Sequence, residues 1–165
     1  MVVVLDRVTS TTVLSNTATE TTMYTYSVPA NMGAKLGEVL FLDLPMTFLN
    51  GSGADRTYTI RIKFGGTTHL TEALIPLPSA GAARPAVIQV RIQNTGSGAQ
   101  WITAMVTVGL AGNDWTAAPI LPPSYGIATG AVDQTTAQTL AVSVQSDAGT
   151  ATQTITTRAG LLTVT

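Results

Sequence analysis

The sequence predicts an all-β protein: a single jelly-roll-like antiparallel β-sandwich of about eight to ten strands with an extended N-terminal arm. Three observations lead to this fold class. Apolar and polar residues alternate in several short segments, clusters of turn-forming residues separate those segments, and no stretch keeps a helical period for more than about two turns. At 165 residues the chain has the length of one domain.

The clearest strand is predicted over residues 57–64. Its four apolar residues, at alternate positions from Tyr58 to Phe64, fall on one face, and Thr, Arg and Lys fall on the other. Such alternation is typical of a strand with one face in the core and the other in water. The following Gly65-Gly66 is a two-residue hairpin signal that leads into a further strand beginning at Thr67.

Less regular alternation and apolar runs predict the remaining strands. They lie near residues 24–28, 39–49, 86–93, 100–108, 138–145 and 151–158. Turn residues fall between them, as in Asn50–Asp55, Asn94–Gly98 and Ser146–Gly149. This spacing suits a jelly roll, but an immunoglobulin-like sandwich fits it almost as well, and periodicity does not give the strand order.

Two segments do not fit the alternating pattern. Residues 1–20 are rich in Thr, Ser and Asn after an initial Val run, with no turn that closes them into a hairpin. We therefore expect an extended arm, with at most one edge strand, before a sandwich over residues 21–165. Residues 109–134 combine glycines and prolines with Trp115 and Tyr125, which predicts a long loop that binds a partner or folds back as a cap over its own core.

Composition excludes several classes of function. Only 10% of the residues are charged and the formal net charge is −1, so the chain lacks the basic surplus of a nucleic-acid binder. Cysteine is absent, which rules out disulfides and thiolate chemistry. No apolar run approaches the roughly 20 residues of a membrane span, and the run before Asp6 is too short for a signal peptide. We expect a protein made in the cytoplasm without a signal peptide, with no membrane partner.

The sequence offers no catalytic, metal-binding or cofactor-binding constellation. Its one histidine, His69, follows a hairpin turn and is predicted to be a surface residue of a strand. No Gly-x-Ser-x-Gly elbow occurs, and four of the nine acidic residues, Asp55, Asp114, Asp133 and Asp147, lie in predicted turns, where hydrogen bonds to the backbone explain them. No metal-ligand spacing is present. The sequence therefore predicts a non-enzymatic protein without a cofactor.

Several motifs resemble a recurrent stretch in structural proteins of tailed bacteriophages. They are Gly37-Glu38-Val39-Leu40, then Asn50-Gly51-Ser52-Gly53, then TYTIRIKFGGTT over residues 57–68, and later TTAQTLAVSVQ over residues 135–145. The resemblance covers residues 35–75 and 133–165, about half of the chain. The arm and the loop at 109–134 lie outside it.

The resemblance implies a component of the virion. Short jelly-roll-like chains in tailed phages are similar to head decoration (cement) proteins, which sit as trimers on the outer surface of the head and clamp neighbouring major capsid subunits. The first expectation is therefore a homotrimeric capsid decoration protein bound to the major capsid protein. The alternative is a head spike, fibre or tail protein that acts as a receptor- or carbohydrate-binding module. Aromatic residues gathered on one exposed face would favour that alternative, but along the sequence they look scattered.

Candidate contact residues come from the two segments outside the regular strands. The β-prone run at the N-terminus could add a strand to the sheet of a neighbouring subunit. Aromatic and apolar residues of the loop are of the types that dominate protein interfaces. The predicted subunit or capsid contacts are Val2, Val3, Val4, Leu5, Trp115, Ile120, Leu121 and Tyr125.

Overall fold

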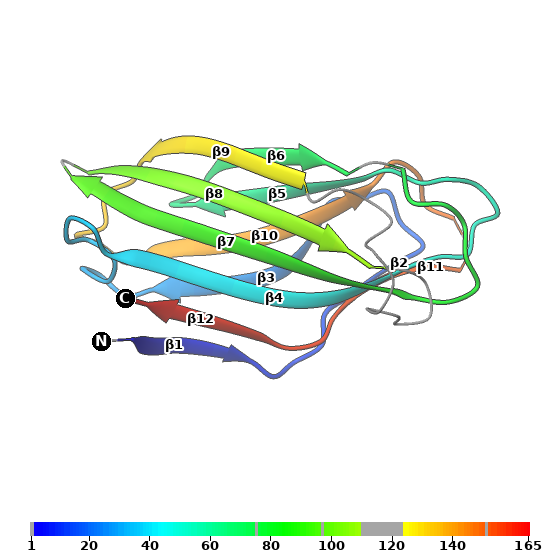
Figure 1. Ribbon diagram of the computed structural model, residues 1–165, viewed down its shortest axis with the longest axis horizontal. Helices are drawn as coiled ribbons and strands as arrows, with labels where there is room; N and C mark the ends of the chain where they lie inside the picture. The colour runs from blue at the N-terminus through cyan, green and yellow to red at the C-terminus, as the bar shows by residue number, and fades with distance from the viewer. Residues whose placement is uncertain (1, 75, 97, 110–123, 151) are drawn as a thin grey trace.

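The computed structural model describes residues 2–74, 76–96, 98–109, 124–150 and 152–165. Within these ranges the chain consists of β-strands in two antiparallel sheets, which confirms the predicted all-β sandwich (Figure 1). The strands are β1 (Val3–Val8), β2 (Val13–Ser15), β3 (Thr21–Val28), β4 (Val39–Asn50), β5 (Tyr58–Phe64), β6 (Thr67–Ala73), β7 (Arg84–Gly96), β8 (Ala99–Val108), β9 (Ser124–Ala131), β10 (Gln138–Ser146), β11 (Gln153–Thr157) and β12 (Gly160–Val164).

The strand order is that of a jelly roll. The larger sheet runs β1-β12-β4-β7-β8-β9, with β11 also beside β4 and β2 beside β11, and the smaller sheet runs β3-β10-β5-β6. We count β1 with β2 and β11 with β12 as single strands and set the inserted pair β8–β9 aside. The strand order across the larger sheet is then first, eighth, third, sixth, and across the smaller sheet second, seventh, fourth, fifth. Both Greek keys of a jelly roll are present, which excludes the immunoglobulin-like order.

The core lies between the sheets and follows the alternation of the sequence. In β5 the residues from Tyr58 to Phe64 alternate between buried and half-buried, as predicted. β4 alternates in the same way over twelve residues. The turn between β5 and β6 uses Gly65 and Gly66 at φ 61° and 80°, the left-handed backbone that a type I′ hairpin requires.

The prediction of an extended arm over residues 1–20 is wrong, because this segment belongs to the sandwich. β1 pairs with β12, and β2 pairs with β11. Leu14 is 1% exposed in the core, and the Tyr24 hydroxyl donates to Asp6 Oδ2 at 3.1 Å, which ties β3 of the smaller sheet to β1. Burial, followed by the nearby Asp6 charge, raises the pKa of Tyr24.

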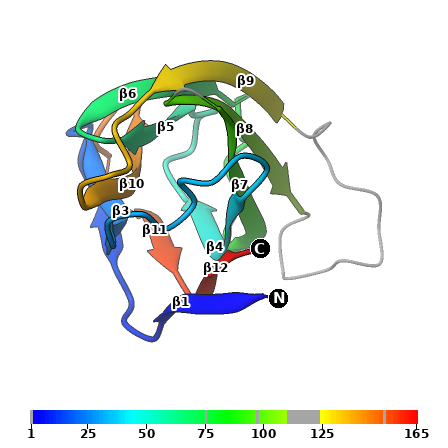
Figure 2. The same ribbon diagram turned by 90° about the vertical axis from the view of Figure 1, so that its left-hand side faces the viewer.

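Part of the segment predicted as a loop, residues 109–134, is also a strand. β9 pairs with β8 along its whole length and forms one edge of the larger sheet. Figure 2 shows β9 curving over to lie beside β6, so that the two sheets meet at this edge. The approach is close because Gly126 lies against Leu70 and Gly130 lies against His69. The rest of the predicted loop, residues 110–123, lies outside the described residues.

Candidate binding face

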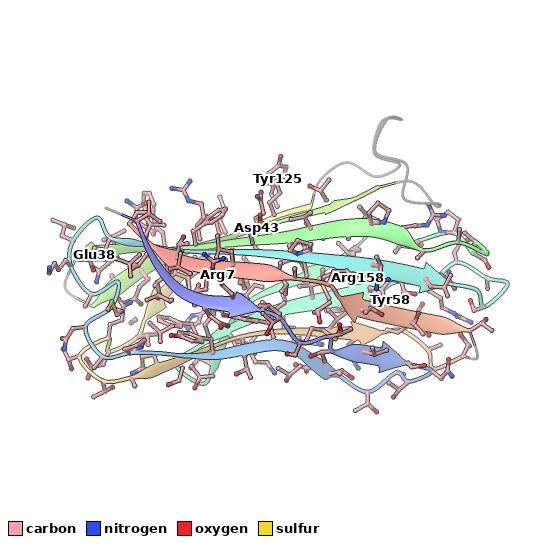
Figure 3. All side chains as sticks on the ribbon, turned by 90° about the horizontal axis from the view of Figure 1, so that it is seen from below. Arg7, Glu38, Asp43, Tyr58, Tyr125 and Arg158 are labelled. Carbon is pink, nitrogen blue, oxygen red and sulfur yellow. The ribbon has the colours of Figure 1, made fainter. Side chains whose placement is uncertain are left out.

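One outer surface of the sandwich is made by the outward side chains of β1, β12, β4, β7, β8 and β9, and we call it the wide face. The strand register arranges these side chains in rows across the sheet. One row runs Arg7, Leu161, Asp43, Gln89, Met105 and Tyr125, the next Thr163, Phe41, Arg91, Thr103 and Ile127, and a third Val39, Gln93, Trp101 and Thr129. Figure 3 labels Arg7, Asp43 and Tyr125, which follow one another from β1 to β9.

Large apolar side chains stand in water on this face. Trp101 is 57% exposed, Tyr125 67% and Ile127 80%. Met105 lies half-buried beside Tyr125, and Phe41 lies half-buried on β4, in the same row as Ile127. Soluble monomers rarely expose a contiguous apolar patch of this kind without using it for binding.

The sequence of β9 explains why its large residues point outward. Its inward positions are Gly126, Ala128 and Gly130, which leave room for β6. An added Cβ at Gly126 would come within 2.5 Å of both Leu70 Cδ atoms. Because the inner side admits only small residues, Tyr125 and Ile127 occupy the solvent side.

A buried amide fixes the orientation of Trp101. Its neighbour Gln100 is 0% exposed, and the Gln100 side chain donates to the Val132 carbonyl at 3.0 Å and accepts from the Val132 amide at 2.9 Å. Gln134 Oε1 accepts a third bond, at 3.2 Å. Since successive residues of a strand point to opposite faces, a buried Gln100 places Trp101 in solvent.

The polar residues of the wide face are mostly uncharged Thr and Gln, and two of its charged residues lack partners among the described residues. Arg91 forms no ion pair or side-chain hydrogen bond within the described part of the chain. The Oδ1 atom of Asp43 is buried without a hydrogen-bond partner. No Lys or Glu occupies an outward position of the six strands. The face therefore mixes large apolar side chains with mostly uncharged polar ones, and within the described ranges it carries an exposed, unpaired Arg91 and a buried Asp43 oxygen without a hydrogen bond.

A groove of about 530 Å³ crosses the wide face over β4, β7, β8 and β9. Its lining residues include Phe41, Gln89, Arg91, Thr103, Met105, Tyr125 and Ile127. This volume falls within the roughly 300–1,000 Å³ typical of ligand pockets. Chemically, the groove offers ring faces, one cation and an amide, and it holds no nucleophile–base pair.

The outer face of the smaller sheet has the opposite character. Glu20 lies between Lys63, 2.5 Å away, and Arg61, 3.4 Å away, and it also accepts a hydrogen bond from Ser143. The Lys63 and Ser143 hydrogen bonds lower the pKa of Glu20. This polar, internally paired face suits contact with water.

The predicted contact residues do not gather in one place. Val2 and Val4 are exposed, whereas Val3 and Leu5 pack against the core of this chain. Because β1 is the last strand at its edge of the larger sheet, addition of this run to a neighbouring sheet stays a prediction. Tyr125 lies on the wide face, at the opposite edge from Val4. The remaining predicted contacts, Trp115, Ile120 and Leu121, lie outside the described residues.

The aromatic residues are not scattered as they look along the sequence, because the fold gathers Phe41, Trp101 and Tyr125 on the wide face. Sequence reasoning missed this face. One signal was present: with Ile102 to Val108 facing the core at alternate positions, Trp101 had to face outward. No such signal existed for Ile127.

His69 is half-buried, with Nε2 3.0 Å from the Phe64 carbonyl oxygen, so its predicted surface placement is wrong in part. Its ring lies against Gly130 of β9. Among the described residues, no group of three or more His, Cys, Asp or Glu could hold a metal ion. The same part of the chain contains no helix long and apolar enough to cross a membrane.

The jelly roll and the wide face together define a structural or binding β-sandwich. No family model matches the chain, and no curated protein sequence matches it. Among solved structures it is similar to the CBM2 module of the Lactobacillus casei BL23 phage J-1 evolved Dit, with 8% identity and a TM-score of 0.40 over 84% of this chain and 67% of that one.

Two further solved structures are similar to this chain over nearly its whole length. An infectious bursal disease virus structure, of the Gx strain, has 12% identity and a TM-score of 0.35, covering 99% of this chain but 41% of the viral one. Peanut lectin with a bound 9mer peptide has 9% identity and a TM-score of 0.36, covering 97% and 98% of the two chains. Likenesses at this level assign no function.

Proposed function

We propose that this chain is a non-enzymatic structural protein of a phage particle: a homotrimeric decoration protein that binds the major capsid protein on the outer surface of the head. The observation that carries the proposal is the contrast between the two outer faces. One is polar, with Glu20 paired to Lys63 and Arg61, and the other exposes large apolar side chains, among them Trp101 and Ile127. A protein with one face of each kind suits an oligomer on a particle surface, in which one face is covered and the other stays in water.

The motifs at residues 35–75 and 133–165, which resemble phage structural proteins, support the same assignment. A β-sandwich also suits cementing mechanically. An oligomer whose copies each make modest contacts across capsomer boundaries attaches strongly to the capsid, because multivalent attachment multiplies weak affinities.

A second function, recognition of a receptor or carbohydrate by a spike, fibre or tail protein, is favoured by one observation. The groove on the wide face brings Tyr125 and Phe41 together with Arg91 and Gln89. Aromatic rings with planar hydrogen-bonding side chains beside them can stack on and orient a sugar.

Cosedimentation tests the first function against the second. The purified full chain is mixed with expanded heads that lack it, from the phage that encodes it, and spun through a sucrose cushion. The proposal expects saturable binding in a fixed ratio to the capsid protein. Absence of binding to heads, together with saturable binding to host cells or their purified surface glycans, would overturn it in favour of receptor recognition.

A further inference from the structure

We infer that the wide face binds a second copy of this chain. The inference rests on the proposed function, which it deepens by assigning the contact between subunits to named residues of β4, β7, β8 and β9. The test below is made on the purified chain without heads, so that it can fail or succeed independently of particle binding.

The composition of the wide face is that of an interface between permanent partners. Buried centres of protein interfaces are enriched in Trp, Tyr, Phe, Met and Arg and depleted in Lys and Glu. The outward positions here include Trp101, Tyr125, Phe41, Met105 and Arg91, with no Lys or Glu. The other outer face, with its ion pairs at Glu20, has none of this character.

The width of the apolar surface favours a protein over a small ligand. From Val4 on β1 to Ile127 on β9 the face spans six strands, or about 24 Å at about 4.8 Å per strand spacing. A surface of that width and similar length projects to roughly 600 Å², which is of the same order as the roughly 800 Å² per partner of a standard interface. The groove includes neither Val4 nor Leu161 nor Trp101, so a ligand bound in it would leave these side chains in water.

The wide face carries charges of both signs, Arg7, Arg91 and Asp43, and every copy of the chain offers the same set to a neighbour. Arg91 lacks a partner within the described residues, and the Asp43 carboxylate has a buried oxygen without a hydrogen bond. A second copy brings both a carboxylate and a guanidinium to the contact. The chain's formal net charge of −1 adds little repulsion between copies.

The timing of assembly favours a second copy of this chain over a capsid subunit as the partner that covers the wide face. A decoration protein is folded before it meets a finished head, and an uncovered Ile127 that is 80% exposed would promote aggregation during that interval. Copies of the same chain are the partner present from the moment of folding. The wide face is therefore covered in the free protein, before attachment.

The test compares two lysine substitutions by sedimentation velocity of the full chain at about 10 µM. Ile127→Lys places a charge on the most exposed large apolar side chain of the proposed contact, and that side chain has no role in the core. Thr25→Lys is the matched control, since Thr25 is an exposed outward residue of β3 in the smaller sheet. We expect the wild type and Thr25→Lys to be oligomeric, and Ile127→Lys to be monomeric, with its dissociation constant raised at least about 100-fold.

A second measurement needs no substitution on the face. In a Trp115→Phe chain, the emission of Trp101 shifts to longer wavelength on dilution, as the oligomer dissociates and water reaches the indole. An oligomer that survives Ile127→Lys, with no shift of Trp101 emission on dissociation, overturns the inference. So does a monomeric wild type, whether its wide face then binds capsid protein, a glycan or nothing.

Discussion

At Gly126 the molecule has no room for a side chain. An added Cβ would meet Leu70 Cγ at 2.8 Å and both Cδ atoms at 2.5 Å, and Leu70 is buried. Gly126→Ala is therefore expected to lower the free energy of unfolding by about 1–3 kcal/mol, because Leu70 must move or β9 must lift from β6. Chemical denaturation measures this, with Gly81→Ala as the control.

Gly81 is exposed, and an added Cβ meets nothing within 4 Å. Its alanine variant should stay within about 0.5 kcal/mol of the wild type. Equal stability of both variants would contradict the close approach of β9 to β6, and with it the reason why Tyr125 and Ile127 face outward.

Glu20 makes stability depend on pH in one direction. Its hydrogen bonds with Lys63 and Ser143 hold its pKa below the ordinary 4.5, so the folded state binds its proton less readily than the unfolded state. The stabilisation is complete above pH 4.5 and is lost as the pH falls through the lowered pKa.

Glu20→Gln removes this contribution. The melting temperature of the variant should lie below that of the wild type at pH 7, and the gap should narrow as the pH falls below 4.5. A gap that stays constant or widens in acid would show that the Glu20 charge does not stabilise the fold.

At the scale of elements, the N-terminal strand β2 has one side chain in the core and its neighbour in water. Leu14 on β2 is 1% exposed, whereas its neighbour Val13 is 50% exposed. We expect Leu14→Ala to cost about 2–5 kcal/mol of unfolding free energy, as deletion of a buried leucine side chain does, and Val13→Ala to cost about 0.5 kcal/mol or less. If thermal or urea unfolding shows that both variants lose equally little stability, residues 1–20 form the extended arm expected from the sequence.

Elements could be predicted from the sequence where their pattern is local. β5 was evident because its alternation and the Gly65-Gly66 turn lie within ten residues of one another. β1 and β2 were not, because their partners come from the other end of the chain, as in the bond from the Thr12 amide to Thr157 Oγ1, 145 residues away. β9 was missed because its inward residues are small and its outward ones large, the reverse of the usual pattern.

The wide face was hidden from sequence reasoning for a related reason. β4 carries apolar residues on both sides, such as Phe41 outside and Leu42 inside, so composition does not tell which side is covered by a partner. The gathering of Phe41, Trp101 and Tyr125 depends on the pairing of β4 with β7, β7 with β8 and β8 with β9. That order is a property of the folded chain.

At the scale of the whole molecule, the account depends on one claim: the wide face is covered in the assembled protein and the opposite face is not. Hydroxyl-radical footprinting of the full chain, read by mass spectrometry at high and low protein concentration, measures this directly. We expect strong protection of Trp101, Met105 and Tyr125 in the concentrated sample, with Lys63 of β5, on the opposite outer face, unchanged. Equal labelling of the three wide-face residues at both concentrations, in a sample shown by sedimentation to be oligomeric, would contradict the account.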